Sequence, residues 1–328
     1  MRPQAQFPLM TALSETIAAQ GDLLEPVLST PIDDAADRIG RSDRIWLVGT
    51  GTSQHAAELG ALMFDSDSRD ARWRSSATFC FDPPKLTNDD AVVVISHTTG
   101  TAFAQRARAF AIESGAAVVS ITAQGRDWPE AVQTVAHERA ETYTVSYLAA
   151  LLVLARLSLA VGEPGFDDRQ LSALPDRVRA AAHARPPIQA APERLLVLAG
   201  VGPGAVTARE GALKLREGAR LPAEGYEAEY LLHGTAVPLG PGDGMIAIQP
   251  SDDRFGMLKL LAEAAASEGL HVETVVEPEG LHPVLAQIPL TVRLQRLASD
   301  LADARGIDPD TVITGAWSGD RLWAAGAP

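Results

Sequence analysis

Three charged side chains and a histidine stand out because their spacing suits acid–base chemistry. Glu210, Lys214 and Glu217 recur at intervals of four and three residues, and His233 follows them in the stretch "LLHG". On a helix, residues at these intervals lie within about 60° of one another, so one face carries all three charges. A lysine beside a carboxylate favours the ionised carboxylate, which is the form that accepts a proton.

The same pattern also fits a solvated helix face, on which a Glu–Lys pair contributes only ~0.3 kcal/mol. What favours a functional site is the position of this helix, which follows "GVGPG" at the end of a predicted strand. In α/β proteins, ligands bind beyond the carboxyl ends of the strands, where loops lead into helix N-termini. We therefore expect the helix to border an active site.

Buried strands alternate with helical stretches along both halves of the chain. Uninterrupted apolar runs between helices are typical of parallel sheets that are covered on both faces, so the predicted fold class is α/β. The runs that indicate strands are 44–51, 91–96 and 116–122 in the first half, and 194–202, 244–250 and 272–276 in the second.

The two halves also resemble each other at an offset of 151 residues, which predicts a duplicated domain. We expect an N-terminal helix at 1–30, a first domain at 31–182, a proline-rich linker at 183–193, a second domain at 194–313 and a tail at 314–328. The residues that coincide are Leu47, Gly49, Gly51, Ala57, Gly60, Ala61 and Leu62 with Leu198, Gly200, Gly202, Ala208, Gly211, Ala212 and Leu213.

Two loops of the first half have the composition of an anion site. "GTGTS" follows the first predicted strand and "SHTTGT" follows the second. Small residues let the backbone approach a ligand, hydroxyls donate hydrogen bonds, and a helix N-terminus favours negative charge. The predicted substrate-binding residues in these loops are Gly51, Thr52, Ser53, Ser96, His97, Thr98 and Thr101.

Other interpretations of these loops are open. The hydroxyls could merely cap the helices that follow, and His97 could pack instead of touching a ligand. A dinucleotide is disfavoured because position 54 is Gln54 where the fingerprint needs a third glycine, and no Walker lysine follows. The matching loop of the second half carries Asp252 and Asp253, which would repel a phosphate. We therefore expect the first half to hold the anion and the second to supply the chemistry.

Composition narrows the class of protein further. The chain has 328 residues, a formal net charge of −14 and one cysteine, Cys80. Such a surface repels nucleic-acid phosphates, and a single cysteine allows no internal disulfide and suits a reducing cytoplasm. The longest apolar run, 147–161, contains Arg156 and is too short to span a membrane. With no metal-binding motif in the sequence, we expect neither a metal nor another cofactor.

These motifs together resemble a known family. Over roughly residues 44–310 the chain is similar to double-SIS (sugar isomerase) proteins, above all to the isomerase half of glucosamine-6-phosphate synthase and to related phosphosugar isomerases and deaminases. The resemblance implies two tandem SIS domains, each a flavodoxin-like three-layer sandwich. The most specific matches are "EGALKLRE" and "LLHG".

Two further segments carry the resemblance. "SHTTGT" is similar to the family's phosphate loop, although Thr98 stands for its second serine and Thr99 and Gly100 replace its Gly-Glu pair. "ETYTVSYLAAL" is similar to the segment that lines the sugar pocket, which implies that Thr144 and Ser146 line it here.

The resemblance implies a role for each of the two most specific motifs. In the family, the final glutamate of the helix moves a proton between C1 and C2 of an open-chain sugar, which assigns that role to Glu217. The histidine helps to open the sugar ring and comes from the neighbouring subunit, which assigns it to His233 in a homodimer with shared active sites. Glu210 and Lys214 support them. The expected activity is isomerisation or deamination of a hexose or amino-hexose 6-phosphate.

Two departures leave a different function open. The synthase carries a glutaminase domain with a nucleophilic cysteine at its start, whereas this chain begins Met1-Arg2, so we expect no use of glutamine without a partner. The synthase also has a lysine in its C-terminal tail, and here the last of three lysines is Lys259. A phosphosugar-binding or sensing protein without catalysis is the alternative. The presence of both Glu217 and His233 favours the enzyme, since a sensor needs no proton transfer.

Overall fold

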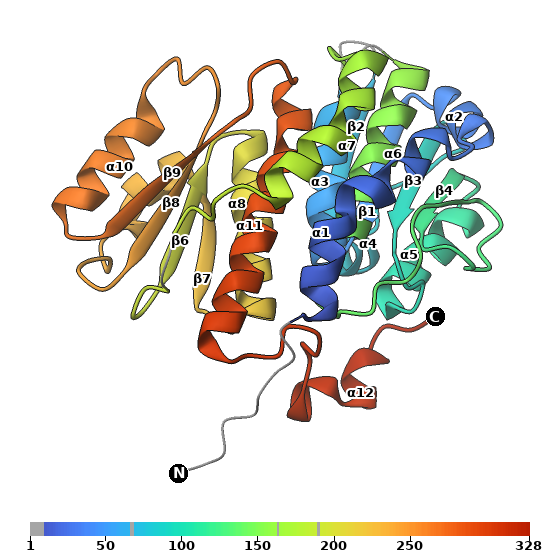
Figure 1. Cartoon of the computed structure of the whole chain (residues 1–328). Coiled ribbons are helices and arrows are strands. Elements are labelled where there is room, and N and C mark those ends of the chain that lie inside the picture. Colours follow the sequence, from blue (N-terminus) through green and yellow to red (C-terminus); the bar gives the residue numbers. More distant parts are fainter. Residues whose placement is uncertain (1–9, 66–68, 163, 189–190) are drawn as a thin grey trace. The chain divides into compact units, whose positions relative to one another are not determined.

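The chain folds into two compact units, each built around one parallel sheet (Figure 1). The computed structural model describes residues 10–65, 69–162, 164–188 and 191–328. The first-sheet unit comprises Gly21–Glu138, Val145–Pro175 and Ile313–Pro328. The second-sheet unit comprises the described part of Met1–Gln20 together with Arg139–Thr144 and Asp176–Val312. The segment Arg139–Thr144 thus belongs to the second-sheet unit although it lies within the sequence of the first.

The first sheet has the flavodoxin-like strand order. Among the described residues its parallel strands run in the order β2-β1-β3-β4-β5. In this order the chain changes its direction across the sheet between β1 and β3, and ligands bind there beyond the carboxyl ends of the strands. The strands are β1 Arg44–Gly49, β2 Asp70–Ser75, β3 Asp90–Ile95, β4 Ala117–Thr122 and β5 Ala131–Gln133.

Helices cover both faces of the first sheet. On one face, Trp46 of β1 packs in a cluster with Ala104 of α5. On the other, a methyl group on Gly60 of α3 would lie 2.6 Å from Leu47 Cδ2 and 2.9 Å from Leu154 Cδ1, so the helices approach β1 closely there. The helices are α2 Asp33–Gly40, α3 Thr52–Phe64, α4 Ser76–Phe81, α5 Ala102–Glu113, α6 Val145–Val161 and the short α12 Asp320–Trp323.

Helix α6 contains the long apolar run of the sequence and is largely buried. Its one charged residue, Arg156, donates from Nη1 to the carbonyl oxygens of Val27 and Thr30 at 2.8 and 2.7 Å. The two backbone carbonyls thus provide hydrogen-bond partners for one nitrogen of the guanidinium. None of the described helices is long and apolar enough to cross a membrane.

The second sheet repeats the first four strands of this order. Its parallel strands run β7-β6-β8-β9 in the described part of the chain. The strands are β6 Leu196–Gly200, β7 Ala223–Glu227, β8 Gly244–Gln249 and β9 His271–Val276. The helices of this unit are α8 Pro203–Gly218, α9 Ala228–Tyr230, α10 Met257–Ser267 and α11 Pro283–Arg305, with α1 Ala12–Leu24 and α7 Asp168–Ala182 each divided between the units.

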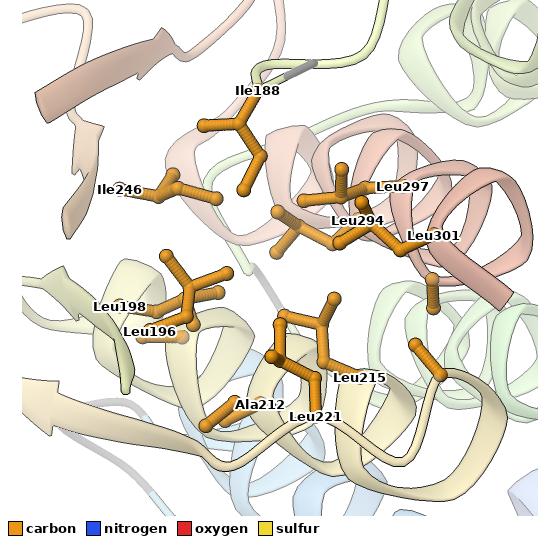
Figure 2. Packing of buried hydrophobic residues seen from close by; sticks show 14 of the residues in the cluster. Ile188, Leu196, Leu198, Ala212, Leu215, Leu221, Ile246, Leu294, Leu297 and Leu301 are labelled. Atoms are coloured by element: carbon orange, nitrogen blue, oxygen red, sulfur yellow. The ribbon is translucent and has the colours of Figure 1, made fainter. Parts of the chain in front are cut away.

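Different helices cover the two faces of the second sheet. On one face, Leu198 of β6 packs with Leu215 of α8 and Leu294 of α11, as Figure 2 shows. On the other, Val197 of β6 packs with Leu258 of α10. Because successive strand residues point to opposite faces, β6 contributes alternately to two cores.

The six predicted strands are confirmed, with ends that shift by one or two residues. The sequence did not predict β2, β5 and β7. β2 reads "DARWRS" and β7 reads "AEGYE", and neither contains an apolar run, while β5 has only three residues. All three lie at sheet edges. An edge strand needs fewer apolar side chains, which is why the apolar-run criterion missed them.

The bounds of the two units differ from the predicted domain bounds at the chain ends and in the helix before the linker. The N-terminal helix is α1, and a short 3-10 turn, Pro26–Ser29, follows it; residues 1–9 lie outside the described residues. Helix α7, predicted in the first domain, is divided between the units at Pro175, and the tail belongs with the first sheet. Residues 189–190 of the predicted linker also lie outside the described residues.

Gly211 of α8 tests how tightly α8 and α11 must pack. A methyl group there would lie 2.4 Å from Leu294 Cδ1 and 3.0 Å from Leu198 Cδ2. We expect Gly211→Ala to lower the free energy of unfolding by about 1–3 kcal/mol, because overpacking outweighs the better helix propensity of alanine. Urea denaturation measures the difference. Gly218→Ala on the same helix is the control, since its nearest neighbours would be 3.7 Å away. Equal stability of the two variants would contradict this packing.

Candidate active site

Helix α8 carries Glu210, Lys214 and Glu217 into the interior of the second-sheet unit. Glu210 and Lys214 are both 0% exposed, because this side of the helix is covered by the core that it shares with α11 and the sheet. The interpretation of the pattern as a solvated helix face is therefore wrong. The charges are buried together, and only the side chain of Glu217, 23% exposed, reaches the surface.

The Lys214 ammonium is surrounded by oxygen atoms. Its Nζ donates to Oε2 of Glu217 at 2.6 Å and to the carbonyl oxygen of Tyr143 at 3.0 Å, and it lies 3.6 Å from Oε1 of Glu210. Taking charges out of water costs on the order of several kcal/mol per ion, and only such close partners offset that cost. Buried charges paired in this way are typical of functional sites.

Glu217 lies at the amino edge of the second sheet and not at its carboxyl edge. Helix α8 starts after β6, and Glu217 is about 21 Å farther along the helix than Pro203. Near it, Arg216 Nη1 donates to the carbonyl oxygen of Ala223, where β7 begins, at 3.1 Å. The expectation that this helix presents its charges at the carboxyl ends of the strands is therefore wrong for Glu217, because the length of the helix moves it to the opposite edge.

His233 lies on the other face of the second sheet from α8. It follows β7 and α9 in the helical turn Leu231–Thr235, and Leu231 packs in the cluster that contains α10. The side chain of His233 is 71% exposed, with Nε2 4.0 Å from Oε1 of Glu229. Glu217 belongs to the helix on the opposite face. A single chain therefore presents the two predicted catalytic residues on different sides of one sheet.

The loop after β1 brings its backbone close to the start of α3. A methyl group on Gly49 would lie 2.3 Å from the carbonyl oxygen of Ser53. Gly51 precedes α3 with a φ of 56°, a conformation that favours glycine. Thr52 and Ser53 form the first turn of α3. The two glycines thus let the chain fold tightly around a helix N-terminus, as expected for an anion loop.

The loop after β3 holds a non-glycine residue in the left-handed region. Thr99 has a φ of 58°, which costs roughly 1–2 kcal/mol for a residue with a Cβ atom. Its N–H donates to the carbonyl oxygen of Ser96 at 3.3 Å, and its carbonyl oxygen accepts from Nε2 of Gln105 at 2.8 Å. The N–H of Gly100 donates to Oγ1 of Thr98 at 3.2 Å. Strain held by several bonds is found most often at functional sites.

The hydroxyl of Thr101 does not cap the helix that follows this loop. Thr101 precedes α5, but its side chain makes no capping hydrogen bond, so the capping interpretation is wrong for this residue. Ser96 is 4% exposed, and its Oγ has no hydrogen-bond partner among the described residues. A buried unpaired hydroxyl costs ~1–3 kcal/mol. A ligand oxygen at this loop would give Ser96 the partner that it lacks.

His97 is held by neighbours of its own unit. Its ring stacks on that of His137, with centroids 5.4 Å apart, and its Nε2 accepts the N–H of Glu138 at 3.4 Å. Burial, then the charges of His137 and Arg126, lower the pKa of His97 to about 4. At neutral pH the imidazole is therefore uncharged, and any part in anion binding is that of a hydrogen-bonding group.

Thr144 and Ser146 lie on either side of the start of α6 and belong to different units. Thr144 is in the second-sheet unit, where its carbonyl oxygen accepts from Nε2 of Gln295 at 3.4 Å. Ser146 is in the first-sheet unit, where its N–H donates to Oε1 of Glu138 at 2.8 Å; the N–H of Val145 donates to Oε2 at 3.3 Å. The carboxylate of Glu138 thus binds the N-terminus of α6, a position where the helix dipole favours negative charge.

The corresponding loop of the second sheet already holds a carboxylate. The N–H of Ser251 donates to Oε2 of Glu277 at 3.2 Å, and Nε2 of Gln287 donates to Oε1 at 2.6 Å. Glu277 is 5% exposed, and this burial raises the pKa of its carboxyl group above the usual range. The chain therefore places its own acidic group where the first sheet has the loop of Ser96.

Sequence analysis missed three contributors to these sites. The Tyr143 ligand of Lys214 is a backbone carbonyl, which any residue type provides. Gln105 looks like an ordinary polar residue of a helix. Glu277 directly follows a predicted strand, and an acidic residue at that point is a signal that sequence analysis could have used.

Comparisons with known proteins show what the chain is similar to. Residues 39–155 match the SIS domain, and this stretch contains all five described strands of the first sheet and both anion loops. The chain is similar to the isomerising glutamine–fructose-6-phosphate aminotransferase of Thermococcus kodakarensis, at 27% identity over 314 residues that cover 85% of this chain and 52% of that protein. The same enzyme of Chlorobaculum tepidum is 27% identical, covering 85% and 51%. The chain spans about half the length of the curated relatives it matches.

Solved structures share the fold. Tagatose-6-phosphate ketose/aldose isomerase from Escherichia coli has a TM-score of 0.78 at 18% identity, covering 94% of this chain and 98% of that one. Glucosamine-6-phosphate deaminase from Thermotoga maritima has a TM-score of 0.75 at 19% identity, covering 92% and 97%. Residues 39–155 thus match an SIS domain, and the chain has the α/β fold, with parallel sheets flanked by helices, of these solved structures.

Ser96→Ala tests the anion loop. Because the hydroxyl has no partner among the described residues, its removal should leave the free energy of unfolding unchanged or slightly higher. Binding of a hexose 6-phosphate should weaken by ~1–3 kcal/mol, or roughly 5- to 150-fold, measured by calorimetry. Ser158→Ala, which removes a buried hydroxyl bonded within α6, is the control and should bind normally. Unchanged affinity in Ser96→Ala would exclude this hydroxyl as a phosphate ligand.

Proposed function

We propose that the chain is a phosphosugar isomerase or deaminase that moves a proton on a hexose or amino-hexose 6-phosphate. The loops after β1 and β3 bind the phosphate. His233 assists opening of the sugar ring, and Glu217 takes the proton next to the carbonyl and returns it to the neighbouring carbon through an enediol or enolamine. The names of the similar proteins, an isomerising aminotransferase, a deaminase and a ketose/aldose isomerase, support this class of reaction.

The observation that carries the proposal is the ion pair of Lys214 and Glu217. The ammonium is fully buried, and it lies 2.6 Å from a carboxylate whose side chain is partly exposed. The positive charge favours the ionised carboxylate, while its exposed part can meet a substrate. A protein that only binds a sugar phosphate has no use for a base and gains nothing from the desolvation cost of this arrangement.

We propose proton transfer without a covalent bond to lysine. The ammonium of Lys214 is enclosed by Glu210, Glu217 and the carbonyl of Tyr143, so it is not available to a carbonyl substrate. The side chains of the other two lysines, Lys85 and Lys259, are exposed. The reaction therefore proceeds on the open-chain sugar itself.

We also propose that the second-sheet unit is a second SIS domain. Its strand order repeats that of β2-β1-β3-β4. The φ of Gly202 is 51° and that of Gly51 is 56°. A methyl group on Gly49 or on Gly200 would lie 2.3 Å from a backbone atom of the residue four positions later. This shared turn geometry supports a duplication with an offset of 151 residues. In the second copy, the carboxylate of Glu277 occupies the loop that corresponds to the anion loop.

We propose that two copies of the chain share their active sites in a cytoplasmic homodimer. His233 and Glu217 lie on different faces of one sheet, so a site with both residues needs a second chain. The surface around His233 suits such an interface, because the apolar side chains Tyr230, Leu232 and Val237 are 60%, 63% and 83% exposed. Clustered exposed apolar residues mark interaction surfaces, and a two-fold dimer is the commonest closed assembly.

Glu217→Gln tests the base, since the amide keeps the shape of the side chain and cannot take the proton. We expect exchange of hydrogen at C1 or C2 of hexose 6-phosphates with deuterated water to fall by ~10²–10⁴-fold, while binding of the sugar phosphate survives. Mass spectrometry or NMR measures the exchange. Glu263→Gln on the exposed side of α10 is the control and should exchange at the wild-type rate.

The same measurement separates the two candidate functions. Exchange at the wild-type rate in Glu217→Gln would remove Glu217 from the mechanism. A wild-type chain that binds hexose and amino-hexose 6-phosphates but exchanges none of their hydrogens would favour the phosphosugar-binding or sensing protein.

Mixing two inactive variants tests the shared site. Glu217→Gln and His233→Ala are combined under conditions that allow subunits to exchange. If His233 acts on the partner's substrate, each mixed dimer contains one site with both residues intact, and up to about half of the wild-type activity per dimer should return. If both residues act within one chain, every site stays defective. A monomeric mass by light scattering would also contradict the shared site.

A further inference from the structure

We propose that the segment Arg139–Thr144 positions the base. Through the carbonyl of Tyr143 it fixes Lys214, and Thr142 is the residue that holds this carbonyl in place. The proposal rests on the function proposed for Glu217. The segment interrupts the sequence of the first-sheet unit and belongs to the second-sheet unit. It therefore gives α8 a ligand that comes from outside the second half of the sequence.

Hydrogen bonds anchor the segment to the chain that follows α11. The hydroxyl of Thr142, which is fully buried, donates to the carbonyl oxygen of Pro309 at 2.7 Å. The N–H of Glu141 donates to the carbonyl oxygen of Asp310 at 2.9 Å, and Oε2 of Glu141 accepts the N–H of Val312 at 2.6 Å. We call residues 309–312 the bracket.

The bracket is itself fixed within the second-sheet unit. The carboxylate of Asp310 accepts the N–H groups of Ala12 and Leu13, at the start of α1, at 2.7 and 2.9 Å. Arg220 Nη2 donates to the carbonyl oxygen of Thr311 at 2.8 Å. A carboxylate at a helix N-terminus is favoured by the helix dipole. The bracket thus offers the segment a rigid support.

The Tyr143 carbonyl determines which carboxylate the ammonium of Lys214 contacts most closely. Nζ of Lys214 is 3.0 Å from that carbonyl oxygen, 2.6 Å from Glu217 and 3.6 Å from Glu210. An ammonium can donate three hydrogen bonds, and the carbonyl oxygen accepts one of them. This leaves another directed at Glu217. If the carbonyl moves away, the ammonium can turn toward Glu210, and its contact with the carboxylate of Glu217 lengthens.

The first test compares Thr142→Val, which removes the hydroxyl at nearly constant shape, with Thr142→Ser, which keeps it. We expect kcat for the hydrogen exchange to fall roughly tenfold in Thr142→Val, the factor that corresponds to one lost hydrogen bond. KM for the sugar phosphate should not change, and Thr142→Ser should restore kcat. Thr291→Val is the matched control, because Thr291 is also fully buried and donates to a backbone carbonyl, that of Gln287, at 2.8 Å.

The second test reads the ammonium without any substrate. The chain has only three lysines, and Lys85 and Lys259 are exposed, so ¹⁵N-lysine NMR resolves the buried one. The ammonium of Lys214 should be protected from exchange with water in the wild type, Thr142→Ser and Thr291→Val. In Thr142→Val its exchange should be roughly tenfold faster, the factor expected for one lost hydrogen bond.

The two tests distinguish two kinds of failure. Equal protection of Lys214 in all four proteins overturns the role of the segment, whether or not the chain is an enzyme. Faster exchange in Thr142→Val together with a wild-type chain that exchanges no sugar hydrogen supports the segment and overturns only the function proposed for Glu217. A fall in kcat together with a rise in KM, in both Thr142→Val and Thr291→Val, would show a general loss of stability. That result would also overturn the proposal.

Discussion

A fully buried ammonium, that of Lys214, sets the constraint that much of the second-sheet unit satisfies. In a region where water is excluded, an unpaired positive charge is far too costly, so acceptors must converge on it. Helix α8 supplies two of them, Glu210 and Glu217, from its own turns. A further acceptor, the carbonyl of Tyr143, comes from a separate segment, which is hydrogen-bonded to the bracket after α11. The carbonyl that this segment supplies is thus one of the acceptors that offset the burial of Lys214.

The two sheets use the same strand order and have different binding edges. At the first sheet, the loop of Ser96 keeps a buried hydroxyl without a partner among the described residues, and Thr99 is held in a strained conformation. At the second, the N–H of Ser251 is bound by the carboxylate of Glu277. An open set of donors can take an external anion, whereas a loop that already holds a carboxylate repels one. The difference supports division of labour between the two sheets.

Much of the fold could be predicted because its elements depend on local pattern. Strands such as β1 and β3 are buried on both faces, and their continuous apolar runs stand out in the sequence. Edge strands such as β2 and β7 escape this criterion because their side chains are mostly polar. For the site, the spacing of Glu210, Lys214 and Glu217 predicted one helix face correctly. It gave no information on the environment of that face, which turned out to be a core.

By itself, the sequence determined which residue types are available: three charged residues at helical spacing, two hydroxyl-rich loops and the histidine of "LLHG". Their mutual positions depend on helix length, strand direction and chain path, which are properties of the whole unit. The length of α8 places Glu217 at the amino edge of its sheet, and the turn after β7 places His233 on the other face. The third neighbour of Lys214 is a backbone carbonyl brought from another part of the chain. Only the tertiary structure decided these points, because a backbone atom has no residue type to read, and a face or edge exists only once the sheet has formed.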